Sequence, residues 1–598
     1  MSKDRDMNEM RLRNQKIDVR GRSAILNIAA ILLNITGVVL TVIGFHESTA
    51  EGTDIILQVS GLLLVAASIF VLIMLKGMLM FSYVSRAFVG GLFIVSGLVK
   101  ANDPWGFAFK LEEYFSPTGL AADFPFFGWF EPYIIELSVL ICVVEIVLGV
   151  AVILGGKIKL ATWSLLGMMV FFAWLTYYTA SCNEKQTLAM EMGMEFNRDC
   201  VTDCGCFGDA LKGSVGRSLS PWESFWKDLI LFYFTLVLMF SIGKIKLNTV
   251  KENWVMVPAS MLVVIFFSWV FGWMLPIFFA LIALLGSFVI GNINIGKMAK
   301  PWKMALFVTL LSFLFSLYTS FYLPVKDYRP YAIGNNLIEK MNDGVPQVSE
   351  FVLIYKNKKT GKEEEFALDQ YAIYGDTSTY QYVDRKETII VPGVDASITD
   401  FQASINFDAL SEDEKKIAYI DSLIQADFDF FYEEKMVVSS TYGADTIAAI
   451  DYDTLYYPDS MYTAGEPFVA LADPYSPWVL DITPYLLTAD NIFLMTIRDI
   501  ENMNEGAIAD FKAVAEGAKA NGIPFFVLSP ATNEQIELFK SKFDFDVTFL
   551  GFDGTEVKII VRSNPGLVLL QNGTVIDKWP SRSIPDFDSI FEDYIKAE

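Results

Sequence analysis

Nine long apolar runs constrain this chain more than any other feature, because they restrict it to a polytopic α-helical membrane protein. Each run holds roughly 18–24 mostly apolar residues, and a hydrocarbon core ~30 Å thick needs about 20 helical residues. Hydrophobic residues make up 53% of the 598 residues, more than an ordinary soluble protein carries. The predicted membrane helices are 23–45, 54–75, 82–100, 131–154, 158–180, 222–243, 254–274, 276–293 and 303–322.

Lysine and arginine gather in alternate connections between these helices, and this bias predicts the orientation of the chain. Basic residues precede the first helix and follow the second, fourth, sixth and eighth, whereas connections such as 104–131 are acidic or mixed. We therefore expect a cytoplasmic amino terminus and export of everything after about residue 323. That last segment carries essentially the whole net charge of −24, which disfavours nucleic acid as a partner.

Four of the five cysteines lie in one polar stretch, 181–221, which this orientation places outside the cytoplasm, where disulfides persist. Cys182, Cys200, Cys204 and Cys206 allow three pairings. One interpretation makes them catalytic, with one exchanging pair and one structural or relay pair; a Cys204–Cys206 ring would be easily reduced. The other makes them two stable disulfides that staple the loop. Their spacing is not that of a zinc site and no histidine is near, so we expect no metal.

Several ionisable or thiol side chains lie in or beside the apolar runs: Lys100, Asp103, Glu136, Cys142, Glu145, Lys227 and Asp228. Charged groups in lipid usually pair or function. Glu145 is expected to be the most buried, and a Glu145–Lys227 pair is one arrangement, with Lys227 reaching the outer surface as the other. Lys100 and Asp103 are candidates to line a site beside the cysteine stretch. Cys142 is expected to be a small buried hydrophobe.

The exported part is predicted to be β-rich over 324–487, with a hairpin between 351–355 and 365–368. The last segment, 488–598, has a strand–helix–strand pattern, further helices, and a terminal hairpin around Gln571-Asn572-Gly573.

This last segment resembles a thioredoxin-like domain. Ser563-Asn564-Pro565-Gly566 occupies the place of that family's cis-proline, so the resemblance implies that Pro565 is cis. Where the family carries Cys-x-x-Cys, residues 499–506 contain no cysteine. Because a thiolate is the nucleophile in that chemistry, this domain cannot perform it. A retained peptide-binding groove and a mere scaffold remain alternatives.

Residues 82–243 resemble the DoxX/MauE family of redox-associated membrane proteins. The resemblance rests on the stretch Arg86 to Pro104, on Glu145-Ile146-Val147-Leu148-Gly149 and on Cys204-Gly205-Cys206-Phe207-Gly208. With its cysteine-free thioredoxin-like tail, the whole chain looks like the large DoxX-family proteins of Bacteroidota. The resemblance implies a bacterial inner-membrane protein with a periplasmic carboxyl-terminal domain.

By this resemblance the chain is a thiol–disulfide component that supports maturation of exported proteins. A quinone is the cofactor it implies, with Glu145, Lys100, Asp103 and Lys227 as candidate binding residues. Whether the chain is an enzyme stays open. The competing interpretation is a non-enzymatic subunit of an envelope or export complex, in membrane lipid, whose acidic domain binds partner proteins.

The expected organisation has six parts: a cytoplasmic terminus (1–22), two additional helices (23–80), a DoxX/MauE-like four-helix unit with the cysteine loop (81–243), three further helices (244–323), a β-rich region (324–487) and the thioredoxin-like domain (488–598).

Overall fold

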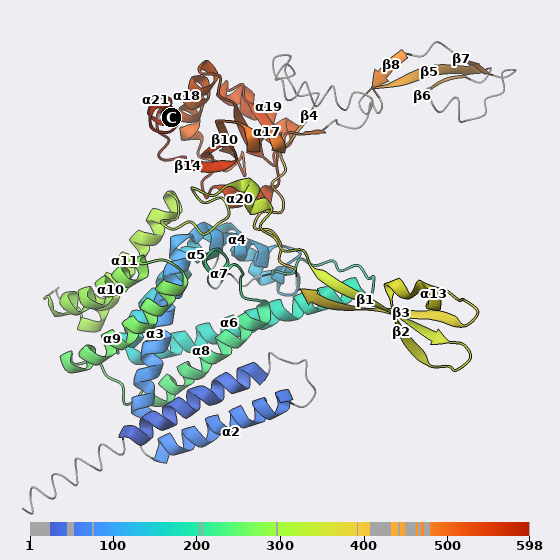
Figure 1. Cartoon of the computed structure of the whole chain (residues 1–598). Coiled ribbons are helices and arrows are strands. Elements are labelled where there is room, and N and C mark those ends of the chain that lie inside the picture. The colour runs from blue at the N-terminus through green and yellow to red at the C-terminus, as the bar shows by residue number, and fades with distance from the viewer. Residues whose placement is uncertain are drawn as a thin grey trace, which may run out of the picture. The chain divides into compact units, whose positions relative to one another are not determined.

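The chain divides into two compact units, Met1–Tyr328 and Arg329–Glu598, which are described one at a time (Figure 1). The first holds the membrane helices and the second a mixed α/β region. The computed structural model describes residues 24–44, 53–74, 77–202, 205, 207, 209–294, 297–391, 393–406, 432–440, 443–448, 462–464, 468–471 and 479–596.

Within these described ranges, nine helices are long and apolar enough to cross a membrane, which confirms the predicted fold class. Their bounds lie within a few residues of the predicted ones, except at the carboxyl end of α6. They are Ala24–Gly44, α2 (Thr53–Met74), α3 (Met78–Asn102), α5 (Ile134–Leu154), α6 (Ile158–Glu191), α8 (Pro221–Ser241), α9 (Val250–Val270), α10 (Leu275–Asn292) and α11 (Lys300–Phe321).

Helix α6 is the exception, because it runs on to Glu191 instead of ending near residue 180. Residues 181–187 are mostly polar, but Glu184, Lys185 and Gln186 are good helix formers, so the helix continues beyond its apolar part. Cys182 therefore lies in a helix and not in a loop. The rest of the predicted loop contains a short helix, α7 (Asp209–Val215).

The segment between α3 and α5 is also helical, although it was expected to be a plain connection. It forms α4 (Pro104–Phe115) and the 3-10 helices η1 (Leu120–Ala122) and η2 (Pro125–Tyr133). Asp103 caps α4, where its carboxylate accepts a hydrogen bond from the Gly106 amide at 3.0 Å, and Pro104 occupies the first turn, a position that suits proline.

Glycines let α3 and α5 approach closely. A Cβ added to Gly149 would lie 2.7 Å from the carbonyl oxygen of Gly90, so a side chain there would force the two helices apart. Farther along α3, Gly97 packs against α5, and a Cβ there would lie 3.0 Å from the Cys142 carbonyl oxygen. Cys142 itself is fully buried, as predicted. Helix α6 packs along α8 in the same unit.

The second unit is built on a seven-stranded sheet with the order β14-β13-β10-β11-β12-β4-β9. Strands β10, β11 and β12 are parallel, and β13 and β14 complete the sheet as an antiparallel pair beside β10. The peptide bond between Asn564 and Pro565, just before β13, is cis. The sheet's strands are β4 (Ser404–Asn406), β9 (Val479–Asp481), β10 (Ile492–Thr496), β11 (Phe525–Ser529), β12 (Thr548–Gly551), β13 (Gly566–Gln571) and β14 (Thr574–Pro580).

Strands β4 and β9 join this sheet although they precede residue 488, the expected start of the last domain. The helices of this unit, which include single-turn and 3-10 segments, are α12 (Leu337–Met341), η3 (Leu368–Gln370), α13 (Tyr371–Tyr374), α17 (Thr483–Thr488), η5 (Glu505–Ala507), α18 (Ile508–Ala520), α19 (Asn533–Phe543), α20 (Gly554–Ile560), α21 (Phe587–Ile590) and η6 (Phe591–Ile595).

Two smaller sheets lie outside this core. Strands β1 (Val348–Asn357), β2 (Glu363–Ala367) and β3 (Tyr380–Val391) form an antiparallel sheet in which β1 and β2 make the predicted hairpin. The other sheet contains β5 (Tyr432–Ser440), β6 (Gly443–Ala448), β7 (Tyr462–Ala464) and β8 (Phe468–Leu471).

Candidate functional site

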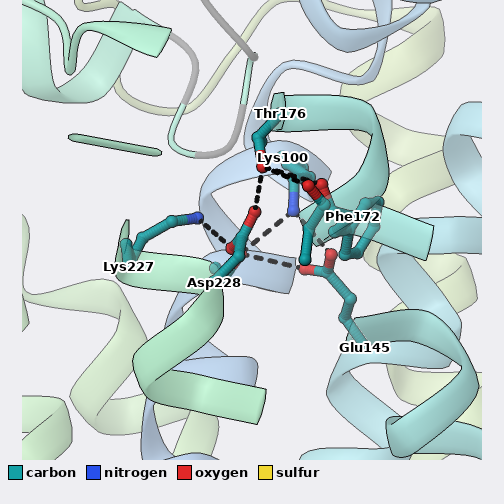
Figure 2. Close-up of polar contacts among 8 residues, drawn as sticks. Lys100, Glu145, Phe172, Thr176, Lys227 and Asp228 are labelled. Carbon is teal, nitrogen blue, oxygen red and sulfur yellow. Dashed lines mark hydrogen bonds and ion pairs between the residues drawn. The ribbon is translucent and has the colours of Figure 1, made fainter. Parts of the chain in front are cut away.

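A cavity of about 220 Å³ lies among α3, α4, η2, α5, α6 and α8. Its wall is mostly aromatic and aliphatic, with a small group of polar side chains, the usual composition of a small-molecule site. The polar group comprises Ser96, Lys100, Glu145, Thr176, Lys227 and Asp228. Figure 2 shows five of these side chains converging from α3, α5, α6 and α8.

Lys100 and Glu145 form a buried ion pair in the cavity wall. The Lys100 Nζ lies 2.6 Å from Glu145 Oε1, and the two side chains are only 5% and 3% exposed. Ser96, one helical turn before Lys100, donates a hydrogen bond to Glu145 Oε2 at 3.0 Å and accepts one from Lys100 at 3.0 Å. Gly97 makes this pairing reachable, because a Cβ there would meet the Glu145 Cβ at 3.1 Å.

A second polar group comes from α8 and α6. The Lys227 Nζ lies 2.9 Å from Asp228 Oδ1, and the Thr176 hydroxyl lies 3.3 Å from Asp228 Oδ2. Glu145 thus pairs with Lys100, whereas a Glu145–Lys227 pair was one of the two arrangements left open by the sequence. Ser96 and Thr176 were missed, because serine and threonine are common in membrane helices and carry no signal of their own.

Aromatic rings surround both lysines. The Lys100 Nζ lies 5.5 Å and 5.7 Å from the ring centroids of Phe107 and Phe172, and the Lys227 Nζ lies 5.3 Å from that of Phe207. These distances are typical of cation–π contacts, which stabilise a cation away from water. The aromatic residues of α4 and η2 were not among the site residues predicted from the sequence, because these two helices were not predicted.

A disulfide joins Cys182 in α6 to Cys200, with 5.7 Å between the two Cα atoms. The segment around Cys200 has further attachments. The Asn183 side chain donates to the Val201 carbonyl oxygen at 2.8 Å, and the Thr118 hydroxyl donates to Asp199 Oδ2 at 2.6 Å. Cys204 and Cys206, the two other candidate catalytic residues, lie outside the described residues.

An ion pair between Arg198 and Asp123 also ties this segment to the connection before η2. The hydrogen bond from the Arg198 guanidinium lowers the pKa of the Asp123 carboxyl, and the tether therefore persists at pH values at which an isolated aspartate is already partly protonated.

The cysteine segment contacts the cavity or its wall at three described positions. Val201 is buried in an apolar cluster that includes Leu111 and Tyr114 of α4. Phe207 lines the cavity itself. Gly205 lies against Phe107 and Lys110 of α4 and has a φ of +61°, which favours glycine. The two sequence neighbours of Cys206 are therefore in contact with the cavity or its wall.

The remaining candidates lie elsewhere. Asp103 caps α4 and does not line the cavity, and Glu136 lies in the first turn of α5, also away from it. Of the four predicted cofactor-binding residues, the structure brings together three: Lys100, Glu145 and Lys227.

These observations define a polytopic membrane protein with an aromatic and charged cavity in its helical unit. Residues 78–186 match the family model described as methylamine utilisation protein MauE, so the chain contains a MauE-family domain. Residues 349–391 match a domain of unknown function, DUF8463. No curated protein and no solved structure matches the chain. The MauE-family domain includes Lys100, Glu145 and Thr176, whereas Lys227 and Asp228 follow it.

Removing the disulfide between Cys182 and Cys200 should lower the stability of the protein. We expect Cys182→Ser/Cys200→Ser to lower the free energy of unfolding by about 3 kcal/mol, because the bridge closes a loop with a sequence separation of 18. The measurement is the thermal transition of the detergent-solubilised protein, with Cys142→Ala as the control for loss of a cysteine elsewhere. Equal transitions for the wild type and the double variant would contradict the expectation.

Proposed function

We propose that this protein is a thiol–disulfide component of a bacterial inner membrane that transfers electrons from the thiols of exported proteins to a quinone in the cavity. The contact of Phe207 with the cavity carries the proposal, because Phe207 directly follows Cys206 in the sequence. The sequence neighbour of a candidate catalytic cysteine therefore lines the proposed quinone site.

The proposed reaction balances in electrons and protons. Two client thiols become one disulfide by exchange with a Cys204–Cys206 disulfide, which is left as a dithiol. Reoxidation of that dithiol releases two electrons and two protons, and a quinone that takes them up becomes a quinol. The Cys182–Cys200 bridge keeps the segment on the cavity and takes no part in the exchange.

The composition of the cavity supports a quinone as the acceptor. Aromatic walls suit a flat ring, and the Lys100 ammonium is a hydrogen-bond donor that suits a carbonyl oxygen. The Thr176 hydroxyl donates to the Phe172 carbonyl oxygen at 2.9 Å, and a bound quinone would receive this bond if the hydroxyl turned toward the cavity. The lysine charge would stabilise negative charge that develops on those oxygens during reduction. Methylamine, named in the family description, has no counterpart in these features, and we do not extend it to this chain.

The carboxyl-terminal unit is proposed to be periplasmic and to hold client proteins. The alternation of basic connections supports this orientation. The strand order β14-β13-β10-β11-β12, with a cis-proline before β13, supports a thioredoxin-like domain. Since no cysteine follows Cys206 in the sequence, this unit can bind a client but cannot exchange thiols with it.

The test uses the full chain, purified in lipid nanodiscs. We expect its organic extract to contain a quinone, and we expect added dithiothreitol to reduce an added quinone faster than it does with empty nanodiscs, followed by quinone absorbance. Absence of both results would favour the competing function, a non-enzymatic envelope subunit. The cysteine-free carboxyl-terminal unit favours that alternative, and a stoichiometric partner without redox activity would support it.

A further inference from the structure

We propose that the cavity takes a long-tailed, lipid-soluble quinone that arrives sideways from the bilayer past Phe130 and Phe171 and is held at its head by Lys100 and Thr176. This inference rests on the proposed function and specifies its acceptor. It excludes a small water-soluble acceptor, and it assigns separate residues to the passage and to the head.

The passage is formed by side chains that both line the cavity and are exposed. Phe130 of η2 and Phe171 of α6 line the cavity, yet they are 42% and 40% exposed. Their neighbours Trp129 and Val170 are 78% and 53% exposed. Exposed apolar side chains on membrane helices face lipid, and aromatic residues gather at the membrane interface. Two ring rotations would therefore connect the cavity with the acyl chains.

Two further cavity rings connect the two rings of this passage. The ring centroid of Phe130 lies 6.1 Å from that of Phe115, which lies 5.8 Å from that of Phe127. Phe127 in turn lies 6.5 Å from Phe171. Three of these four rings come from α4 and η2, and all four line the cavity. This surface offers contacts to an isoprenoid tail but no polar group.

Polar side chains occur elsewhere in the wall, where a quinone head would find its partners. Lys100 is a donor that is buried and already oriented by Glu145 and Ser96. Thr176 lines the same cavity, and its hydroxyl, which donates to the Phe172 carbonyl oxygen at 2.9 Å and lies 3.3 Å from Asp228 Oδ2, would turn to a bound quinone head by rotation about its side-chain bond. Figure 2 shows Lys100 and Thr176 in the same polar group, together with Glu145 and Asp228. Phe207 also lines the cavity, so a head held here lies near the cysteine segment.

The experiment measures binding without thiol chemistry, in the Cys204→Ser/Cys206→Ser background in nanodiscs. The probes are a decyl-substituted benzoquinone and its methyl-substituted analogue, and the readout is quenching of tryptophan fluorescence in a stopped-flow instrument. Trp174 stacks on the cavity ring Phe127 with 6.1 Å between centroids and is a suitable reporter. We expect the decyl probe to bind at least severalfold more tightly than the methyl probe, since its tail buries additional CH₂ groups.

Single variants distinguish binding of the quinone head from entry of the quinone through the passage. Thr176→Val is expected to weaken both probes by roughly tenfold, because a buried hydrogen bond is lost. Phe130→Ala is expected to accelerate both association and dissociation of the decyl probe severalfold while leaving those rates for the methyl probe nearly unchanged. Leu140→Ala, which changes an exposed side chain of α5 outside the cavity lining, is the control and should behave as the parent protein.

Equal affinities for the two probes, or decyl kinetics that do not respond to Phe130→Ala, would overturn the inference. If the decyl probe binds as described while dithiols fail to reduce it in the wild type, the proposed function fails and the binding site stands. If wild-type dithiol oxidation proceeds with a soluble acceptor and neither probe binds, the inference fails and the thiol function stands.

Discussion

Quinone reduction driven by dithiols is expected to fall to the background rate of empty nanodiscs when Cys204 and Cys206 are replaced by serine. A serine hydroxyl neither forms a disulfide nor ionises near neutral pH, so the exchange step has no substitute. No other pair of cysteines is free to replace them, since Cys182 and Cys200 are bonded to each other and Cys142 is fully buried. The measurement is the initial rate of quinone absorbance loss at saturating dithiothreitol.

Two matched variants give this experiment its controls. Cys142→Ala should keep the full rate, because that residue lies within the α3–α5 packing and does not line the cavity. Cys182→Ser/Cys200→Ser should keep part of the rate, because Asn183 and Thr118 still hold the segment. Wild-type turnover by Cys204→Ser/Cys206→Ser would refute the redox proposal and leave the envelope-subunit alternative.

Lys100→Met alone is expected to lower the free energy of unfolding by about 3–5 kcal/mol, because it leaves the Glu145 carboxylate buried without its counter-charge. The double variant Lys100→Met/Glu145→Leu should recover most of that loss, since two apolar side chains of similar size pack where the ion pair was. Fluorescence-detected size-exclusion chromatography after heating would compare the four members of this double-mutant cycle.

The surface pair Lys110–Glu113 is the matched control for that cycle. Its charged atoms lie 3.0 Å apart, but the two side chains are 25% and 45% exposed. Water screens such a pair, so the single variant Lys110→Met should cost less than about 1 kcal/mol. If Lys100→Met and its double variant lost equal stability, burial of an uncompensated charge would not be the cause, and loss of packing around the Lys100 stem would be.

The membrane helices could be predicted from sequence because apolar length is a local property. The charged residues Lys100, Glu145 and Lys227 stood out for the same reason, as rare side chains in apolar surroundings. Their pairing could not be predicted. It depends on how closely α3 approaches α5, which Gly97 sets, and this distance is a property of two helices together.

The helices between α3 and α5 and the short strands β4 and β9 were not predicted, for other reasons. Residues 104–133 hold four prolines and many aromatic residues, so they match neither a membrane span nor an ordinary surface helix. Their fold depends on packing, as the stacked rings of Phe115 and Phe127 illustrate. Strands β4 and β9 could not be predicted, because each has only three residues and pairs with strands distant in sequence.

The formal charges around the cavity cancel, since Lys100 faces Glu145 and Lys227 faces Asp228. In a low-dielectric interior, an electron that arrived alone would give this neutral set a net negative charge, which Lys100, already paired with Glu145, would offset only in part. A bound acceptor should therefore take up one proton with each electron, and its midpoint potential should fall as the pH rises. The cavity would then disfavour a long-lived radical anion and act as a two-electron site, which matches the two electrons released by a dithiol.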